Sequence, residues 1–136
     1  MIVSNITIEP RYSETDQMGV VHHANYLIYM ELGRLDWLAA LGFSYATMES
    51  NGFLLPVRKI NIDYLKPMQF GCSYQLKTSL IELPTTRVKF AYEITDPTGQ
   101  ICAQANLLLV FTNKTTFRPC RPPQDFLQHC SRLWKD

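Results

Sequence analysis

A carboxylate, a glycine and two histidines stand close together in residues 12–34, which read YSETDQMGVVHHANYLIYMELGR. Asp16 lies in a polar segment just before apolar residues with helical spacing, and Gly19 permits a sharp backbone turn. A helix N-terminus presents unpaired N–H groups and a positive dipole end. Such groups can hold an oxyanion while a carboxylate attacks a carbonyl or activates water. On this pattern alone, an ordinary turn or N-cap acid is the stronger interpretation of Asp16.

The adjacent histidines, His22 and His23, do not form a recognisable metal motif. Neighbouring side chains rarely converge on one ion, and no cysteine or carboxylate cluster accompanies them, so we expect no metal and no cofactor. A catalytic triad is not indicated, because no serine stands in a Gly-x-Ser-x-Gly segment. Glu31 and Arg34 are spaced as an ion pair on a helix surface, although Glu31 could also face a site.

Composition limits the classes of function. The chain has 136 residues, enough for one domain, and 46% are hydrophobic, so a core can form without disulfides or metal. A formal net charge of +1 argues against nucleic-acid binding by bulk electrostatics. The four cysteines lack CxxC spacing and are expected to be free thiols in a reducing cytoplasm. We find no signal-peptide pattern and no run of about 18 apolar residues, so no membrane span is expected.

Alternating apolar residues predict five strands. Ile2, Ile6 and Ile8 share one side of a first strand over residues 2–12. The run at 107–111 is apolar at every position, which predicts a central strand covered on both faces. The four later strands are expected at residues 55–65, 73–83, 87–95 and 101–112.

Helical spacing predicts one long helix at residues 24–41. Its apolar stripe consists of Leu27, Ile28, Leu35 and Leu38, widened by Met30 and Trp37. The helix is too apolar to lie on a surface, so the strands should wrap around it. Short helices are expected at residues 45–51 and 124–133. These elements give an α+β fold in a single domain over residues 1–136, with one helix on one antiparallel sheet. An uncovered sheet face and sheet edge predict a homo-oligomer.

Many positions of the first stretch resemble the signature of the 4-hydroxybenzoyl-CoA thioesterase-like family of the hot-dog fold, closest to bacterial acyl-CoA thioesterases. The residues that carry this resemblance are Tyr12, Thr15, Asp16, Gly19, Val20, Val21, His23, Ala24, Asn25, Tyr26, Glu31 and Arg34. A second stretch, from Pro56 through Arg58 to Pro67, resembles the strand that follows in those enzymes. In element order, the resemblance spans nearly the whole chain.

The resemblance implies a five-stranded antiparallel sheet wrapped around one helix, in dimers that often pair into tetramers. It also implies metal-free hydrolysis of an acyl-CoA thioester to a free acid and CoA. Asp16 would be the nucleophile or the general base, and the backbone N–H of His23 would polarise the thioester carbonyl. The expected substrate-binding residues are Gly19, Val21, Asn25, Tyr26 and Arg58, with Arg58 the best candidate for the CoA phosphates.

Two positions depart from the family pattern. His22 stands where relatives often carry tyrosine, and Met18 lies in a segment that usually has small residues. Two alternative functions stay open: a hot-dog dehydratase and a non-catalytic acyl-thioester binding module. The lack of a matching histidine on the helix counts against the first, and Asp16 counts against the second.

Overall fold

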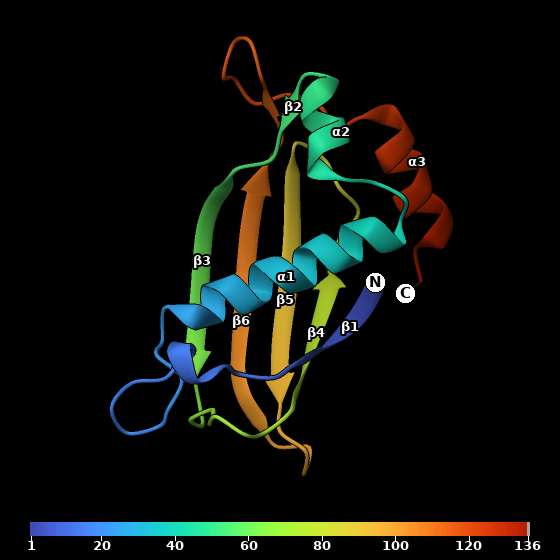
Figure 1. Ribbon diagram of the computed structural model, residues 1–136. Helices are drawn as coiled ribbons and strands as arrows, with labels where there is room; N and C mark the ends of the chain where they lie inside the picture. The colour runs from blue at the N-terminus through green and yellow to red at the C-terminus, as the bar shows by residue number, and fades with distance from the viewer. Residues whose placement is uncertain (136) are drawn as a thin grey trace.

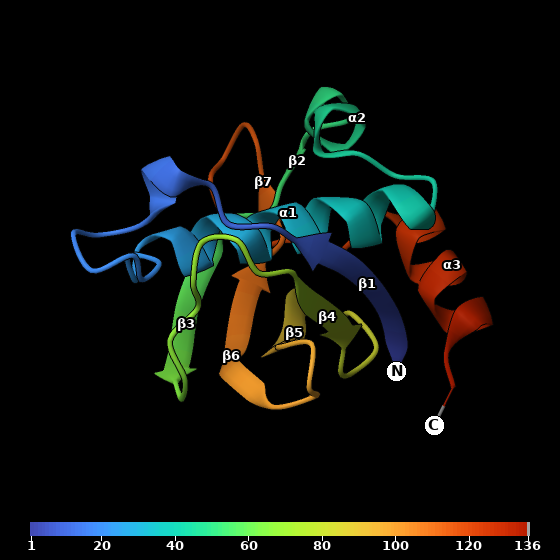
Figure 2. The same cartoon turned by 60° about the horizontal axis from the view of Figure 1, so that its bottom comes forward.

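One long helix, α1 (Asn25–Ala40), lies across a five-stranded antiparallel sheet (Figure 1). The structure, a computed structural model, describes residues 1–135. The strand order is β1-β4-β5-β6-β3, and α1 covers one face of this sheet (Figure 2). The strands are β1 (Ile2–Ile8), β3 (Val57–Tyr64), β4 (Tyr74–Leu80), β5 (Arg87–Thr95) and β6 (Ile101–Val110). The predicted α+β fold, with five antiparallel strands around one helix, is confirmed.

Smaller elements close the two ends of the fold. A 3-10 turn, η1 (Tyr12–Glu14), follows β1, so the first strand ends earlier than residue 12, the limit expected from sequence. Helix α2 (Tyr45–Ser50) is capped by Ser44, whose Oγ accepts the N–H of Thr47 at 3.1 Å. The remaining elements are β2 (Phe53–Leu54), β7 (Thr112–Asn113) and the terminal helix α3 (Gln124–Leu133).

Strand alternation places one set of side chains under the helix. On β5, Val88, Phe90, Tyr92 and Ile94 are all buried, while the residues between them are partly exposed. β5 and β6 are joined by a tight turn, in which Asp96 Oδ1 accepts the N–H groups of residues 98 and 100 at 2.9 and 3.0 Å. The core therefore lies between α1 and this face of the sheet.

The prediction of which side of α1 packs on the sheet was correct for half of the expected stripe. Met30, Trp37 and Leu38 are buried as expected, but Leu27, Ile28 and Leu35 are exposed. The helix sits close to β4 at Gly33, where an added Cβ would lie 2.6 Å from a threonine side chain. The side chains that face the sheet are Tyr26, Tyr29, Met30, Trp37 and Leu38. Because α1 is apolar on nearly every side, spacing alone did not identify the packed face.

The apolar run in β6 is only partly covered within one chain. Leu107 and Leu109 face the helix and are buried, but Leu108 points to the opposite face and is partly exposed. The expectation of a strand covered on both faces therefore fails for the single chain, because no layer of the described residues lies on that side. No helix among residues 1–135 is long and apolar enough to cross a membrane.

Candidate active site

The loop between η1 and α1 is tied together at its base by Glu14. The backbone carbonyl of Glu14 accepts the N–H of His22 at 2.9 Å and the Nδ2–H of Asn25 at 2.8 Å. Its carboxylate, almost fully buried, accepts the backbone N–H of Arg11 at 2.7 Å and the hydroxyl of Tyr29 at 2.9 Å. One residue therefore joins the end of β1, the end of the loop and the first two turns of α1.

Burial and hydrogen bonding act in opposite directions on the pKa of Glu14. Burial alone would raise the pKa of Glu14, but the Arg11 N–H, the Tyr29 hydroxyl and the Arg11 charge outweigh it, so the pKa is lowered. Burial, together with its bond to the carboxylate, raises the pKa of Tyr29 well above its ordinary value. Tyr29 therefore stays a neutral donor and Glu14 a charged acceptor near neutral pH.

Asp16 forms the turn at the tip of the loop. Its Oδ1 accepts the backbone N–H groups of Met18 at 2.8 Å and Val20 at 3.2 Å. Its own N–H donates to the carbonyl of Val20 at 2.8 Å, and its carbonyl accepts from Gly19 at 3.2 Å. Gly19 has a φ of 76°, the left-handed conformation that its lack of a Cβ favours. The carboxylate is exposed, and among the described residues its Oδ2 has no hydrogen-bond partner.

The two histidines lie at the entry to α1. Their rings stack with centroids 4.3 Å apart, and His22 Nδ1 accepts the N–H of Ala24 at 3.2 Å. The N–H groups of residues 25 and 26 donate to the carbonyls of His22 and His23. Within the described part of the chain, the N–H of His23 has no acceptor, whereas the N–H groups on either side of it do. Among residues 22–26, it is the backbone donor left free for another molecule.

A hollow of about 240 Å³ opens beside this helix start. Tyr64, at the end of β3, donates its hydroxyl to the His23 carbonyl at 3.2 Å and packs its ring edgewise on Tyr26 with centroids 4.9 Å apart. Burial raises the pKa of Tyr26, which is fully covered. The hollow is lined by Val20, Val21, His23, Tyr26, Tyr64, Leu65, Lys66 and Pro67.

Lys66 provides a positive charge at the edge of this hollow. Its Nζ donates to Asp96 Oδ2 and, at 2.7 Å, to Gln100 Oε1, both in the β5–β6 turn region. The hydrogen bond from Lys66, followed by that from Thr98, holds the pKa of Asp96 far below its usual range. The lysine is therefore a charged group fixed in place beside the pocket.

The structure brings together most of the predicted site residues, with two qualifications. Val21, His23 and Tyr26 line the hollow, and Asn25 holds the loop through its bond to Glu14. Asp16 and Gly19 lie on the same loop but are not part of the hollow's lining.

Arg58 is not brought to the loop within one chain. It is exposed near the start of β3, next to the irregularity between Val57 and Lys59. Tyr64, which contacts His23, lies six residues further along the same strand, a distance of roughly 20 Å in an extended chain.

Sequence reasoning missed several residues of this region. Tyr64, Lys66 and Pro67 lie within the second motif, so the motif could have placed them, but they were not assigned to the site. Glu14 was not assigned to the site because no sequence pattern distinguishes an acid two residues before Asp16. Across residues 1–135, no three His, Cys, Asp or Glu side chains are grouped closely enough to hold a metal ion.

Comparisons with known proteins identify the family of the chain. The family model of the thioesterase-like superfamily matches residues 10–130. The Bacillus subtilis (strain 168) protein named "Putative acyl-CoA thioesterase YneP" is 41% identical over 119 residues, which are 88% of this chain and 86% of that protein. The Escherichia coli acyl-CoA thioester hydrolase YbgC is 24% identical over 116 residues, 85% of this chain and 87% of its own.

Solved structures give the same result. A DHNA-CoA thioesterase from Staphylococcus aureus superposes with a TM-score of 0.90 at 35% identity, covering 98% of this chain and 91% of that one. A 4-hydroxybenzoyl CoA thioesterase in complex with 4-hydroxybenzoyl CoA has a TM-score of 0.84 at 16% identity, covering 96% and 99%, which supports the fold alone. The chain therefore belongs to the thioesterase-like superfamily, and it is a thioester hydrolase with the hot-dog fold.

Proposed function

We propose that the protein is an acyl-CoA thioesterase that hydrolyses an acyl-CoA to a free acid and CoA. One observation carries the proposal. The loop between η1 and α1 holds both an exposed carboxylate, at Asp16, and a backbone N–H without an acceptor, at His23. Relatives support the choice of thioester, because YneP, YbgC and the S. aureus enzyme are all named for CoA thioesters. The residues that bind CoA and the acyl group are part of the proposal.

The chemistry would divide between these two groups. The His23 N–H, at the positive end of the α1 dipole, would donate to the thioester oxygen and stabilise the negative charge that forms there. Asp16 Oδ2 would attack the carbonyl carbon to give an anhydride and release CoA as the thiolate, or would take a proton from the attacking water. Both routes need an ionised carboxylate, and both consume one water for each thioester cleaved.

The hollow beside the helix start suits the part of the substrate next to the thioester. Tyr26 and Tyr64 give it aromatic walls, and Lys66 places a fixed positive charge at its edge. We propose that Lys66 attracts the phosphates of CoA. Arg58 serves the same purpose only if another copy of the chain brings it near the loop, because it lies far along β3 in its own chain.

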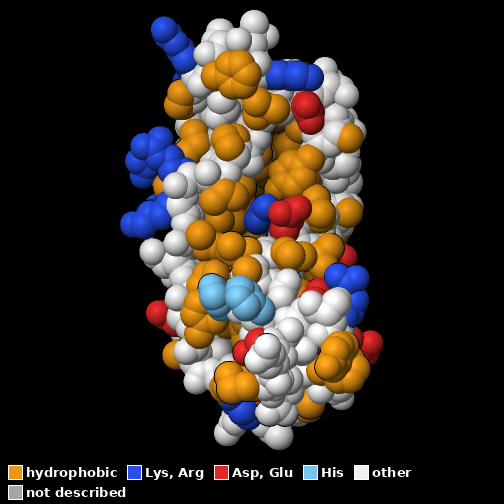
Figure 3. Space-filling model, turned by 60° about the vertical axis from the view of Figure 1, so that its left-hand side comes forward, with side chains coloured by type: hydrophobic (Ala, Val, Ile, Leu, Met, Phe, Trp, Pro, Cys, Tyr) orange, Lys and Arg blue, Asp and Glu red, His pale blue; other side chains and the backbone are white. Residues whose placement is uncertain are grey.

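We also propose that the enzyme is a homo-oligomer. Leu27, Ile28, Leu32 and Leu35 form an exposed apolar strip along α1, and Figure 3 shows hydrophobic side chains gathered on the face that also carries histidine side chains. An apolar strip of this kind is typical of a surface that another molecule covers. A second copy would bury it, and the unpaired edge of β3 lies at the side of the same sheet. The four free cysteines fit the reducing cytoplasm that we propose as its location.

Asp16→Asn tests the catalytic proposal. An asparagine Oδ1 can still accept the N–H groups of Met18 and Val20, so the loop should keep its turn while the carboxylate is lost. We expect kcat/KM on a panel of acyl-CoAs, followed by free thiol release, to fall by about 100-fold or more. Asp36→Asn is the matched control, because it removes an exposed carboxylate from α1 itself and should leave the rate unchanged.

Two outcomes would remove the proposal. Undiminished activity of Asp16→Asn would exclude the carboxylate from the reaction. Absence of thiol release from every aliphatic and aromatic acyl-CoA, with binding still detected, would leave the non-catalytic binding module. Hydration of an enoyl-CoA without thiol release would instead identify a dehydratase.

A further inference from the structure

Tyr64 links the sheet to the start of α1. It is the last residue of β3, and its hydroxyl donates to the carbonyl of His23 at 3.2 Å. Among residues 1–135, no other strand residue is hydrogen-bonded to the segment 22–26. The sheet therefore holds the backbone of this segment at one point, which is the residue that carries the free N–H.

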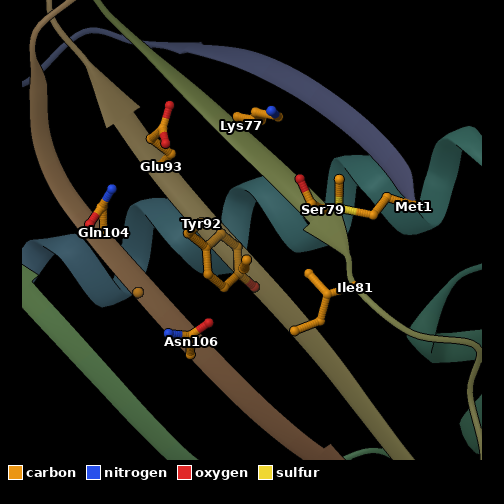
Figure 4. A pocket seen from close by; sticks show the side chains of 10 residues that line it. Met1, Lys77, Ser79, Ile81, Tyr92, Glu93, Gln104 and Asn106 are labelled. Atoms are coloured by element: carbon orange, nitrogen blue, oxygen red, sulfur yellow. The ribbon is translucent and has the colours of Figure 1, made fainter. Parts of the chain in front are cut away.

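Strand register determines that Tyr64 faces this segment. Tyr64 pairs with Ala103, which is fully buried on the helix side of the sheet. Its neighbour Asp63 pairs with Gln104, and Figure 4 shows Gln104 on the face of the sheet away from α1. Because successive strand residues point to opposite faces, the ring of Tyr64 stands on the helix side. It packs there on Tyr26, so both the strand and this contact fix the place of its hydroxyl.

Two peptide groups flank His23. The first joins His22 to His23 and carries the free N–H, and its carbonyl accepts the N–H of Asn25 at 3.0 Å. A trans peptide is planar with its carbonyl and N–H on opposite sides, so this bond directs the free N–H outward from the helix start. The second joins His23 to Ala24. Its carbonyl accepts the Tyr64 hydroxyl, and its N–H donates to His22 Nδ1 at 3.2 Å.

Only one of the bonds to these two peptide groups comes from the sheet. The others join groups within residues 22–26, so they move with the helix start as a unit. Tyr64 belongs instead to the strand end that, with residues 65–67, forms one wall of the hollow. Its bond therefore sets the position of the His23 N–H relative to the wall that a substrate would contact.

We propose that Tyr64 is a positioning residue for thioester hydrolysis, because its hydroxyl holds the peptide groups of His23 so that the free N–H points at the thioester oxygen. This role rests on the proposed function, in which that N–H stabilises the developing negative charge. Tyr64 acts through the backbone of His23 and does not contact the reacting carbonyl. A substrate in the hollow would shield the hydroxyl from water and strengthen its bond to the His23 carbonyl.

The expected size of the effect follows from the donor that Tyr64 positions. Loss of a whole oxyanion donor lowers kcat by about 100-fold to 1,000-fold. Hydrogen bonds weaken steeply once the angle at the hydrogen falls below about 120°, so a donor that is free to turn loses part of this contribution. We therefore expect loss of the Tyr64 hydroxyl to lower kcat by about 10-fold.

Tyr64→Phe tests this role, because it keeps the ring that packs on Tyr26 and removes only the hydroxyl. We expect kcat on acyl-CoA substrates to fall by about 10-fold while KM stays within about twofold, since the surface that the substrate contacts is retained. Tyr45→Phe is the matched control. It removes a phenol hydroxyl from α2 that accepts the Nε–H of Arg34 at 2.8 Å, away from the loop, and should leave kcat unchanged. Urea unfolding followed by circular dichroism gives the stability of both variants.

Relaxation dispersion of the His23 amide nitrogen gives a second measurement that needs no catalysis. Exchange between orientations on the microsecond-to-millisecond timescale broadens an amide signal in such an experiment. We expect this exchange at His23 in Tyr64→Phe, but not in the wild type or in Tyr45→Phe.

The two measurements distinguish failure of this role from failure of the proposed function. If the wild type releases thiol from no acyl-CoA, the proposed function fails, and the amide measurement alone decides whether Tyr64 holds the His23 peptide groups. The positioning role is overturned if Tyr64→Phe keeps kcat within about twofold of the wild type, or raises KM alone, which would mean that the hydroxyl binds substrate. An equal loss of kcat in Tyr45→Phe, or a His23 amide in Tyr64→Phe that stays as rigid as in the wild type, would overturn it too.

Discussion

Removal of the Glu14 carboxylate should loosen the loop that carries Asp16. Glu14 accepts hydrogen bonds from the Arg11 N–H and the Tyr29 hydroxyl at 2.7 and 2.9 Å. Tyr29 is only 3% exposed, so Glu14→Ala would leave its hydroxyl without an acceptor inside the protein. A buried hydroxyl without a partner costs about 1–3 kcal/mol, and lost bonds to a charged acceptor add to this. We therefore expect the free energy of unfolding to fall by about 2–4 kcal/mol.

A double-mutant cycle isolates the bond between the two side chains. Tyr29→Phe removes the hydroxyl together with its need for an acceptor, so Glu14→Ala should cost at least about 1 kcal/mol less in that background. Urea unfolding followed by circular dichroism gives all four free energies. If the two single costs add in the double variant to within about 0.3 kcal/mol, the hydroxyl and the carboxylate do not stabilise each other and the reasoning is refuted.

The same pair predicts a dependence on pH. The folded-state pKa of Glu14 lies below the ordinary value of 4.5. A carboxyl with a depressed pKa contributes stability above its unfolded-state pKa and loses it as the pH falls through its folded-state pKa. The difference in unfolding free energy between the wild type and Glu14→Gln should therefore shrink as the pH is lowered from about 4.5. A difference that stays constant down to the acid unfolding transition would contradict this.

Two further predictions concern the core and the thiols. Gly33→Ala should lower the unfolding free energy by about 1–3 kcal/mol, because the new Cβ would lie 2.6 Å from Thr78 Oγ1. An unchanged midpoint of thermal unfolding would contradict this, because it would show that α1 moves away from β4 at no cost in stability. In a titration with a thiol reagent, exposed Cys72 should react first, while Cys130 is buried with its pKa raised to about 12 and should react only on unfolding. A fast phase that persists in Cys72→Ser would contradict this assignment.

Much of the fold could be predicted from the sequence because its strands alternate. The expected strand at residues 87–95 matches β5, and the expected helix at 124–133 matches α3. The orientation of α1 could not be predicted in the same way. Its apolar residues surround the helix, and the packed side is set by the close approach at Gly33, which involves β4 and is invisible in local spacing. Leu108 was misjudged for a related reason. Its strand is central, but no layer formed by residues 1–135 covers the face of the sheet opposite α1.

For the site, the sequence could indicate the loop between η1 and α1, but not the hydrogen bonds that fix its conformation. Asp16, Gly19 and His23 stand out by type and spacing, and the structure places all three on one closed loop. The contribution of Glu14 depends on Tyr29, fifteen positions away in sequence and adjacent only once α1 has formed. Long-range partners of this kind have no local pattern.

The hydrogen bonds at the tip of the loop affect how the substrate specificity of the protein can change. The bonds that set Asp16 come from the main chain of Met18, Gly19 and Val20, and no bond involves the side chain of Gln17 or of Met18. Met18 is 82% exposed. Substitutions at positions 17 and 18, whether natural or from a combinatorial library, can therefore change the surface that a substrate contacts without moving the Asp16 carboxylate. Changes of substrate specificity are expected to concentrate at these two neighbouring positions.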